Sequence, residues 1–138
     1  MLQGQELINK AYAIAVKSHE GQYRRDGKTP YIEHPLIVAD KFKNSIIQSI
    51  ALLHDVMEDS DITTKDLLEQ GIPVIVVNAV VILTKRNDEK YLDYILRVKN
   101  NPYTTSIKIE DIKHNYPTTH KSKQERYDLA LYILKGEK

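Results

Sequence analysis

The chain has 138 residues, enough for one domain with a substantial core, and we expect a single domain over residues 1–138. Its 20 Lys and Arg against 19 Asp and Glu give a formal net charge of +1, so no global basic excess indicates nucleic-acid binding. Cysteine is absent, which excludes disulfides and thiolate metal sites and is compatible with a reducing compartment.

The ends and the apolar runs of the chain give no targeting or membrane signal. Residues 1–6 lack the basic and apolar segments of a signal peptide. The longest apolar run, residues 74–83, is interrupted by Asn78 and is too short to cross a bilayer. We therefore expect a cytoplasmic protein without a membrane partner.

The first predicted element is a helix over residues 6–18, where apolar residues recur at helical spacing until Gly21 ends the pattern. His19 lies at the end of this helix, and capping by the helix dipole is favoured over a ligand role. Residues 21–33 form a loop in which Arg24, Arg25 and Lys28 place three cations within five residues. This loop is either an ordinary solvated turn or a clamp for phosphate.

A second helix is predicted from His34, because Pro35 suits the first helical position. His34 would then lie at the cap, where histidine is usually structural; it becomes a candidate ligand only if the fold brings it to His54. The next helix is capped by Asn44 or Ser45 and is predicted to run to about Met57.

That central helix ends in four ionisable groups within six residues, His54, Asp55, Glu58 and Asp59. On a helix these groups crowd one side near the negative end of the dipole, where carboxylates are disfavoured. A divalent cation would resolve both problems. The alternative is a frayed acidic helix end followed by a solvated loop.

The rest of the chain is also predicted to be helical. Thr63 and Asp66 resemble a capping box for a short helix that ends at Gly71. Residues 73–83 are rich in β-branched side chains, but no second convincing strand exists to pair with them, so we predict a buried helix. Three further helices are predicted at residues 88–98, 103–115 and 121–135.

These elements add up to seven or eight helices without a sheet, so the predicted fold class is all-α. Within residues 103–115, Asp111 and Asn115 share a face, while His114 is assigned to packing or to the support of a ligand. Two imidazoles, His34 and His54, and two carboxylates, Asp55 and Asp111, would make a mixed nitrogen and oxygen site. Such a site suits Mn²⁺, Fe²⁺, Co²⁺ or Zn²⁺.

This pattern resembles the HD superfamily of metal-dependent phosphohydrolases, and within it the hydrolase domain of the alarmone synthetase/hydrolases and their small stand-alone relatives. The blocks that carry the resemblance, in chain order, are residues 19–24 (HEGQYR), 27–39 (GKTPYIEHPLIVA), 51–60 (ALLHDVMEDS), 83–85 (LTK) and 108–115 (KIEDIKHN). The resemblance implies a compact HD-domain helical bundle.

The resemblance also implies a function, in which a Mn²⁺ ion assists hydrolysis of the 3′-pyrophosphate of (p)ppGpp to GDP or GTP and pyrophosphate. It implies that Glu58 and Asp59 orient and deprotonate the attacking water. The implied metal ligands are His34, His54, Asp55 and Asp111. The residues expected around the guanosine nucleotide are Arg24, Arg25, Asp26, Asn115 and Thr118, with Lys28 in the same basic loop.

The sequence departs from the family pattern at residues 116–123, which are short, polar and unlike the longer segment that helps to hold the nucleoside. No synthetase domain is expected, so the chain should not make alarmone. The departure leaves two alternatives open: a phosphohydrolase for another nucleotide, such as NADPH or a nucleoside phosphate, and a catalytically idle nucleotide-binding module. An exposed apolar face would imply a homodimer.

Overall fold

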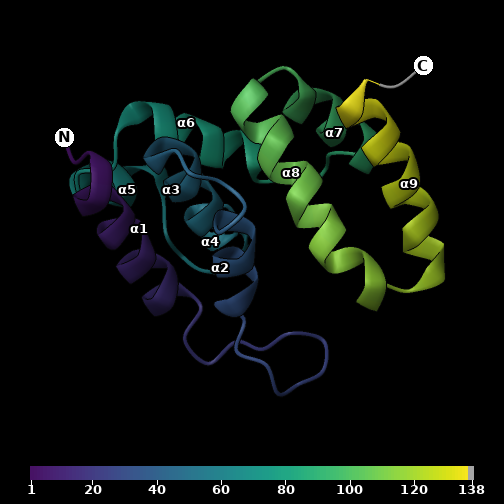
Figure 1. The fold of residues 1–138 in the computed structure, drawn as a ribbon, viewed down its shortest axis with the longest axis horizontal. Helices are drawn as coiled ribbons and strands as arrows, with labels where there is room; N and C mark the ends of the chain where they lie inside the picture. The colour runs from purple at the N-terminus through teal and green to yellow at the C-terminus, as the bar shows by residue number, and fades with distance from the viewer. Residues whose placement is uncertain (137–138) are drawn as a thin grey trace.

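The computed structural model describes residues 1–136, and in that range the chain is helical (Figure 1). The elements in chain order are α1 (Gly4–Ser18), α2 (Glu33–Ala39), α3 (Ser45–Leu53), α4 (Val56–Asp59), α5 (Thr64–Glu69), α6 (Val74–Leu83), α7 (Tyr91–Lys99), α8 (Pro102–Asn115), a 3₁₀ turn (Tyr116–Thr118) and α9 (Lys121–Lys135). The only β pairing among these residues is an isolated bridge between Tyr23 and Pro30. The prediction of an all-α chain is confirmed.

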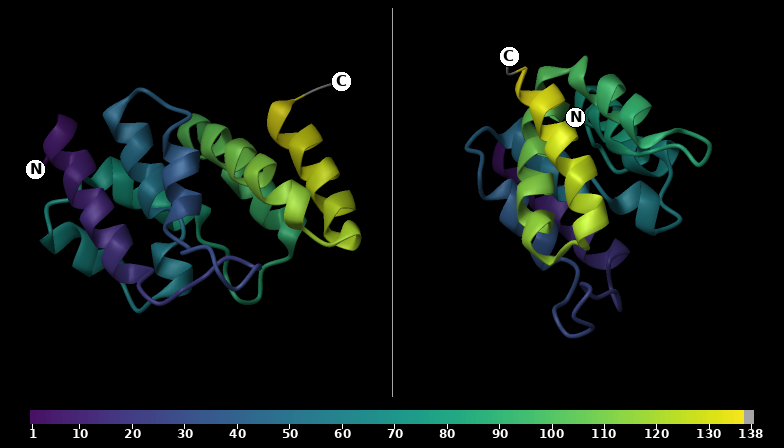
Figure 2. Two further views of the ribbon diagram at one scale, coloured as in Figure 1. Left: turned by 60° about the horizontal axis from the view of Figure 1, so that its bottom comes forward. Right: turned by 90° about the vertical axis from the view of Figure 1, so that its right-hand side faces the viewer.

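Helices α3 and α8 organise the molecule. Helix α3 packs against α1, α2 and α6, and α8 packs against α2, α6, α7 and α9. Helices α1 and α9 lie at opposite ends of the long axis, and α8 lies between the α2–α3 pair and α9 (Figures 1 and 2). Because α2, α3 and α8 meet in the middle, side chains far apart in the sequence can reach one centre.

Side-chain caps explain where several helices begin. Asn44 caps α3 by accepting from the backbone N–H groups of Ile46 and Ile47, at 2.8 and 3.2 Å. Thr63 and Asp66 form the predicted capping box of α5. Asn101 caps α8 in the same way as Asn44 caps α3, so three boundaries follow from short polar side chains in the sequence.

Helix α6 is the element where local preference and burial disagree. Its residues are mostly β-branched, a composition typical of strands, yet it forms the predicted buried helix after Pro73. Val76, Val77 and Val80 are at most 1% exposed, so tertiary burial outweighs the intrinsic preference. None of the helices in residues 1–136 combines the length and apolar character needed to span a membrane.

The end of the central helix differs from the prediction. Helix α3 ends at Leu53 rather than near Met57, and the backbone turns at His54 and Asp55 before the short α4 begins. Glu58 and Asp59 therefore lie on a separate helical turn instead of at the negative end of α3. His54 and Val56 on either side of the turn are buried, whereas Glu58 and Asp59 are exposed, so the chain reaches the surface within the short α4 and the carboxylates avoid burial.

The start of α2 also differs from the prediction, by two residues. The helix begins at Glu33, so His34 lies inside the first turn rather than at the cap, and Pro35 is the third helical residue. Proline is tolerated there because the N–H groups of the first turn have no partner within the helix. As a result, the His34 side chain is buried and packs toward α3 and α8.

Candidate metal centre

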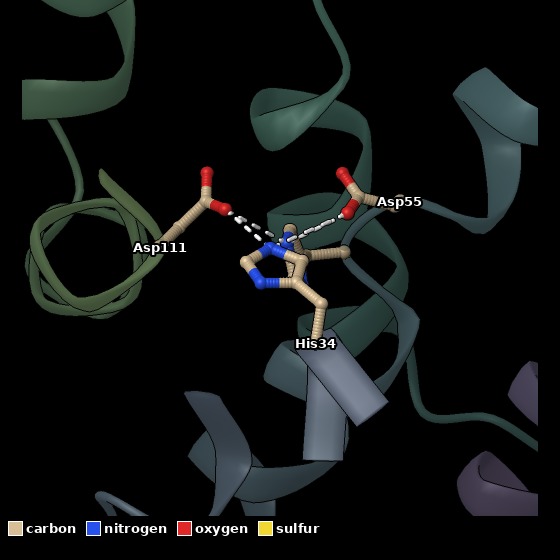
Figure 3. A group of neighbouring side chains, drawn as sticks. His34, Asp55 and Asp111 are labelled. Carbon is tan, nitrogen blue, oxygen red and sulfur yellow. Dashed lines mark hydrogen bonds and ion pairs between the residues drawn. The ribbon is translucent and has the colours of Figure 1, made fainter. Parts of the chain in front are cut away.

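Four side chains from three separate segments converge between α2, α3 and α8. His34 comes from α2, His54 and Asp55 from the turn between α3 and α4, and Asp111 from α8. One nitrogen or oxygen atom of each lies within 4.8 Å of those of the others. Figure 3 shows Asp55 and Asp111 directed from opposite sides toward the imidazole of His34. The structure thus brings together all four residues that the sequence predicts as metal ligands.

In this cluster each imidazole nitrogen lies near an oxygen of both carboxylates. His34 Nε2 lies 2.7 Å from Asp111 Oδ1 and 3.8 Å from Asp55 Oδ2. His54 Nε2 lies 3.0 Å from Asp55 Oδ2 and 3.4 Å from Asp111 Oδ1. Both imidazoles are at most 2% exposed and Asp111 is 4% exposed, so water screens these groups little.

The tautomer of His54 shows that the cluster fits a cation. Its Nδ1 lies 2.6 Å from the Ala51 carbonyl oxygen, which can only accept, so Nδ1 carries a proton. In the neutral ring, Nε2 then presents a lone pair toward Asp55 and Asp111, and this buried atom has no hydrogen-bond partner. A lone pair facing carboxylates is repulsive unless a proton or a metal ion lies between them. Burial lowers the pKa of His54, but Asp55 and Asp111 outweigh it and raise the pKa.

His34 is oriented by another histidine. Its Nδ1 lies 2.7 Å from Nδ1 of His114, and the two rings are nearly parallel, with an interplanar angle of 15°. If Nε2 of His34 is to hold a cation, its Nδ1–H must donate a hydrogen bond to Nδ1 of His114. The neutral His114 ring then carries its own proton on Nε2. The sequence assigned His114 only to packing or support, whereas the structure places it in direct contact with a predicted ligand.

Two polar side chains that the sequence analysis missed hold the carboxylates. Lys108 Nζ donates to Asp111 Oδ2 at 2.8 Å, and the Tyr31 hydroxyl donates to Asp55 Oδ2 at 2.6 Å. Although burial opposes ionisation of Asp111, Lys108 and the two imidazoles hold its pKa well below its usual range. Lys108 lies three residues before Asp111 on one helix face, a spacing that could have identified it.

Glu58 and Asp59 lie on α4, directly after Asp55 and Val56, and Glu58 is held by the segment that follows α6. Glu58 Oε1 accepts a hydrogen bond from the backbone N–H of Lys85 at 2.6 Å. Partial burial raises the pKa of Glu58, whereas this hydrogen bond lowers it. Partial burial, together with the charges of Asp55 and Glu58, raises the pKa of Asp59 to about 6. This contact gives the end of the block at residues 83–85 a position beside Glu58, which the sequence did not indicate.

The basic loop of residues 21–33 contacts the C-terminal end of α8. Arg24 donates to Asn115 Oδ1 at 2.8 Å, and Arg25 donates to the hydroxyls of Thr118 and Thr119 at 3.1 and 3.0 Å. A cavity of about 280 Å³ opens here. Its lining includes Arg24, Arg25, Asp26, Thr29, Glu33, His34, Ile37, His114 and Thr118. The cavity therefore joins most of the predicted nucleotide residues to the His34 side of the cluster.

Asp26 lines this cavity but is engaged within the loop, whereas Lys28 and Asn115 do not line it. The carboxylate of Asp26 accepts from the Thr29 hydroxyl and from the backbone N–H groups of Lys28 and Thr29. These hydrogen bonds, chiefly those from Thr29, lower the pKa of Asp26 to about 2. The carboxylate thus shapes the loop. Lys28 is exposed and does not line the cavity.

Comparisons with known proteins first define the fold. The structure superposes with a TM-score of 0.74 on a solved structure described as a metazoan orthologue of SpoT that hydrolyses ppGpp. The two chains share 19% sequence identity, and the match covers 97% of this chain and 86% of the other. The all-helical fold of this chain is therefore the fold of that hydrolase.

Sequence similarity then points to particular relatives. The chain is 42% identical over 66 residues to guanosine-3′,5′-bis(diphosphate) 3′-pyrophosphohydrolase of Vibrio cholerae, covering 45% of this chain and 9% of the relative. It is 30% identical over 148 residues to a GTP pyrophosphokinase of Myxococcus xanthus, covering 94% of this chain and 19% of the relative. The chain thus spans less than a fifth of these curated relatives. No family model matches it. The resemblance to the alarmone hydrolase domain is confirmed.

Proposed function

We propose that this protein hydrolyses the 3′-pyrophosphate of (p)ppGpp to GDP or GTP and pyrophosphate, with the help of a divalent metal ion. The observation that carries the proposal is the convergence of His34, His54, Asp55 and Asp111, with an unpartnered buried nitrogen at its centre. The similarity to proteins named for this activity supports the choice of substrate. The proposal treats residues 1–138 as one hydrolase domain acting on a cytoplasmic nucleotide.

The four clustered side chains are proposed to hold the ion. Two imidazoles and two carboxylates suit Mn²⁺, and Fe²⁺, Co²⁺ and Zn²⁺ accept the same donors. A bound ion would polarise a phosphoryl oxygen and make a nearby water more acidic. Lys108 and Tyr31 occupy Asp111 Oδ2 and Asp55 Oδ2 and fix both carboxyl groups in orientation.

Glu58 is proposed as the general base. Its carboxylate is held by the Lys85 backbone close to the cluster, while its side chain remains exposed to entering water. A carboxylate within hydrogen-bond reach of the attacking water can accept its proton. Asp59 is proposed to help orient the same water from the adjacent position.

The Arg24 cavity is proposed to hold the nucleotide. Arg24 and Arg25 supply positive charge, and His114 and Thr118 supply groups that can hydrogen-bond to sugar or phosphate oxygens. Fixed cations beside a phosphoryl group stabilise the charge that develops during transfer. Residues of α8 and of the basic loop would thus position the substrate against the cluster.

The experiment that tests this function is incubation of the pure protein with ppGpp and Mn²⁺. Release of pyrophosphate and GDP is expected, and chelation of the ion should stop it. The Asp111→Asn variant serves as a matched control, because it keeps the shape of the side chain while removing its charge. Cleavage of other nucleotides without any pyrophosphate from ppGpp would overturn the substrate assignment.

A second candidate is hydrolysis of another nucleotide, such as NADPH or a nucleoside phosphate. The favouring observation is that Arg24 and Asn115 hydrogen-bond to one another and Arg25 to Thr118, so these groups are already partly satisfied. The shortened segment after Asn115 forms only a 3₁₀ turn before α9. A substrate panel under the same conditions separates the two candidates.

A further inference from the structure

A second cavity lies beside Glu58 and Asp59, and the proposed function assigns it no role. Its volume is about 450 Å³. It is lined by Met57, Glu58, Asp59, Thr84, Lys85, Arg86 and Asn87. None of these residues lines the Arg24 cavity. One cavity is therefore lined in part by His34 of the cluster, and a separate one lies beside Glu58 and Asp59, next to Asp55 in the chain.

This second cavity brings two cations next to the two carboxylates that are proposed to act on the water. Beside Glu58 and Asp59 stand two cations, Lys85 and Arg86. Within the part of the chain that the structure describes, neither cationic side chain forms an ion pair. The Lys85 ammonium contacts only the Arg86 carbonyl oxygen, at 3.2 Å, and the Arg86 side chain is exposed. Both remain available to an anion.

This inference rests on the proposed reaction. The stereochemistry of that reaction indicates which anion lies in the cavity beside Glu58. The water oxygen bonds to the phosphorus attached to O3′, and Glu58 takes up a water proton. The P–O3′ bond breaks, its electron pair stays on O3′, and O3′ takes a proton from solvent to become the 3′-hydroxyl, while Glu58 releases its proton to solvent. Entering and leaving oxygens lie roughly in line, on opposite sides of the phosphorus. The phosphorus that carries the new oxygen therefore lies on the Glu58 side of the broken bond, and the nucleoside lies on the other side.

We propose that the cavity lined by Glu58, Lys85 and Arg86 binds the departing diphosphate group, and that the Arg24 cavity binds the nucleoside part. A diphosphate beside two carboxylates is repelled unless cations offset its charge. The Lys85 and Arg86 side chains supply those cations, and an arginine fork suits phosphate oxygens. The Lys85 backbone N–H meanwhile holds Glu58, so one short segment positions the base and receives the product.

Product inhibition separates the two cavities. Inorganic pyrophosphate and GDP are used as separate inhibitors at a fixed concentration of free Mn²⁺. The double variant Lys85→Gln/Arg86→Gln should raise the inhibition constant of pyrophosphate about tenfold or more, the effect of losing a charge-assisted hydrogen bond. Its inhibition constant for GDP should change less than about twofold, because GDP occupies the Arg24 cavity.

Two control variants distinguish a loss of binding at one cavity from a general effect of removing positive charge. Arg24→Gln should show the reverse pattern: it should raise the inhibition constant of GDP more than that of pyrophosphate. Lys65→Gln, an exposed lysine on α5 that lines neither cavity, should leave both constants unchanged. Calorimetric titration of pyrophosphate into Mn²⁺-loaded wild type and the double variant gives the same comparison without turnover.

Two results would overturn the subsite: equal pyrophosphate binding by wild type and the double variant, or an equal loss for both products. Failure of the proposed function is distinguishable, because it appears as a wild-type protein that binds pyrophosphate yet releases none from ppGpp. The Lys85→Gln/Arg86→Gln comparison still decides the subsite in that case.

Discussion

At the scale of single residues, the centre depends on the groups that hold its four donors. His54 is oriented by a carbonyl oxygen, whereas His34 is oriented by the Nδ1 atom of His114. Outer partners of this kind fix the tautomer and the angle of the ring that binds the metal. His114 is therefore expected to control the affinity of the site although it binds no metal itself.

Replacing His114 with Phe should lower the affinity for Mn²⁺ about 10- to 100-fold, because His34 Nδ1–H loses its acceptor. Calorimetric titration of the metal measures this. His114→Gln, which restores an acceptor oxygen, should recover part of the loss. Equal affinity in wild type and the Phe variant would show that the contact does not orient His34.

Replacing Glu58 with Gln should lower kcat about 10²- to 10⁴-fold, the usual contribution of a general base. Affinity for Mn²⁺ should remain within about twofold, because Glu58 is not one of the four donors. Glu125→Gln, a change of an exposed carboxylate on α9, controls for the loss of one negative charge. Turnover that survives in Glu58→Gln at the wild-type rate would refute the assignment.

At the scale of elements, the end of α6 connects the core to Glu58, the proposed general base. Arg97 on α7 donates to the carbonyl oxygens of Ile82 and Thr84 and pairs with Glu89. A cation at a helix C-terminus satisfies carbonyl groups that lack a partner within the helix. This contact holds the segment whose next residue, Lys85, binds Glu58.

Replacing Arg97 with Gln should lower the free energy of unfolding by roughly 2 kcal/mol, because several carbonyl and carboxylate oxygens lose a charged donor. Chemical denaturation measures this. The variant should also lower kcat, since the Lys85 segment loosens. Lys99→Gln, at an exposed position of the same helix, should have little effect on either quantity. Identical unfolding curves for Arg97→Gln and wild type would contradict the structural role.

The ion pair predicts a dependence of stability on pH. The hydrogen bond from Arg97 lowers the pKa of Glu89 from 4.5 to about 2. A depressed pKa means that the contribution is complete above 4.5 and is lost as the pH falls toward 2. The difference in Tm between wild type and Glu89→Gln should therefore shrink over that range. A difference that stays constant with pH would argue against the pair.

At the scale of the whole molecule, the ion would add a further link between helices that packing and side-chain hydrogen bonds already join. Because α2, the turn after α3, and α8 each contribute a donor, a bound ion should favour the folded state over the unfolded one. At about 100 times the dissociation constant, the gain is about 2.7 kcal/mol. Tm should rise by roughly 8 °C. Asp111→Asn should abolish the shift, and a shift that persists there would place the ion elsewhere.

The sequence predicted the helical class and the capped helix starts because these depend on local patterns. Asn44 and the Thr63 capping box act within one turn, so neighbouring residues are enough to recognise them. It missed the break at His54, because that break depends on what surrounds the end of α3 rather than on helix preference.

In the candidate site, too, some residues could be predicted from the sequence and others only from the structure. The four donors were predicted from the resemblance, and their convergence is visible only in the structure. The partners of the donors come from distant segments: His114 lies 80 residues from His34, and Lys85 lies 27 residues from Glu58. No local spacing could reveal those contacts, whereas Lys108 could have been found from its spacing to Asp111.

The most direct test of the central claim is an anomalous difference map from crystals grown with Mn²⁺, recorded at the manganese absorption edge. We expect one strong peak bound by Nε2 of His34, Nε2 of His54 and the carboxylates of Asp55 and Asp111. A map without a peak between these four side chains, or with its main peak bound by other residues, would contradict the account.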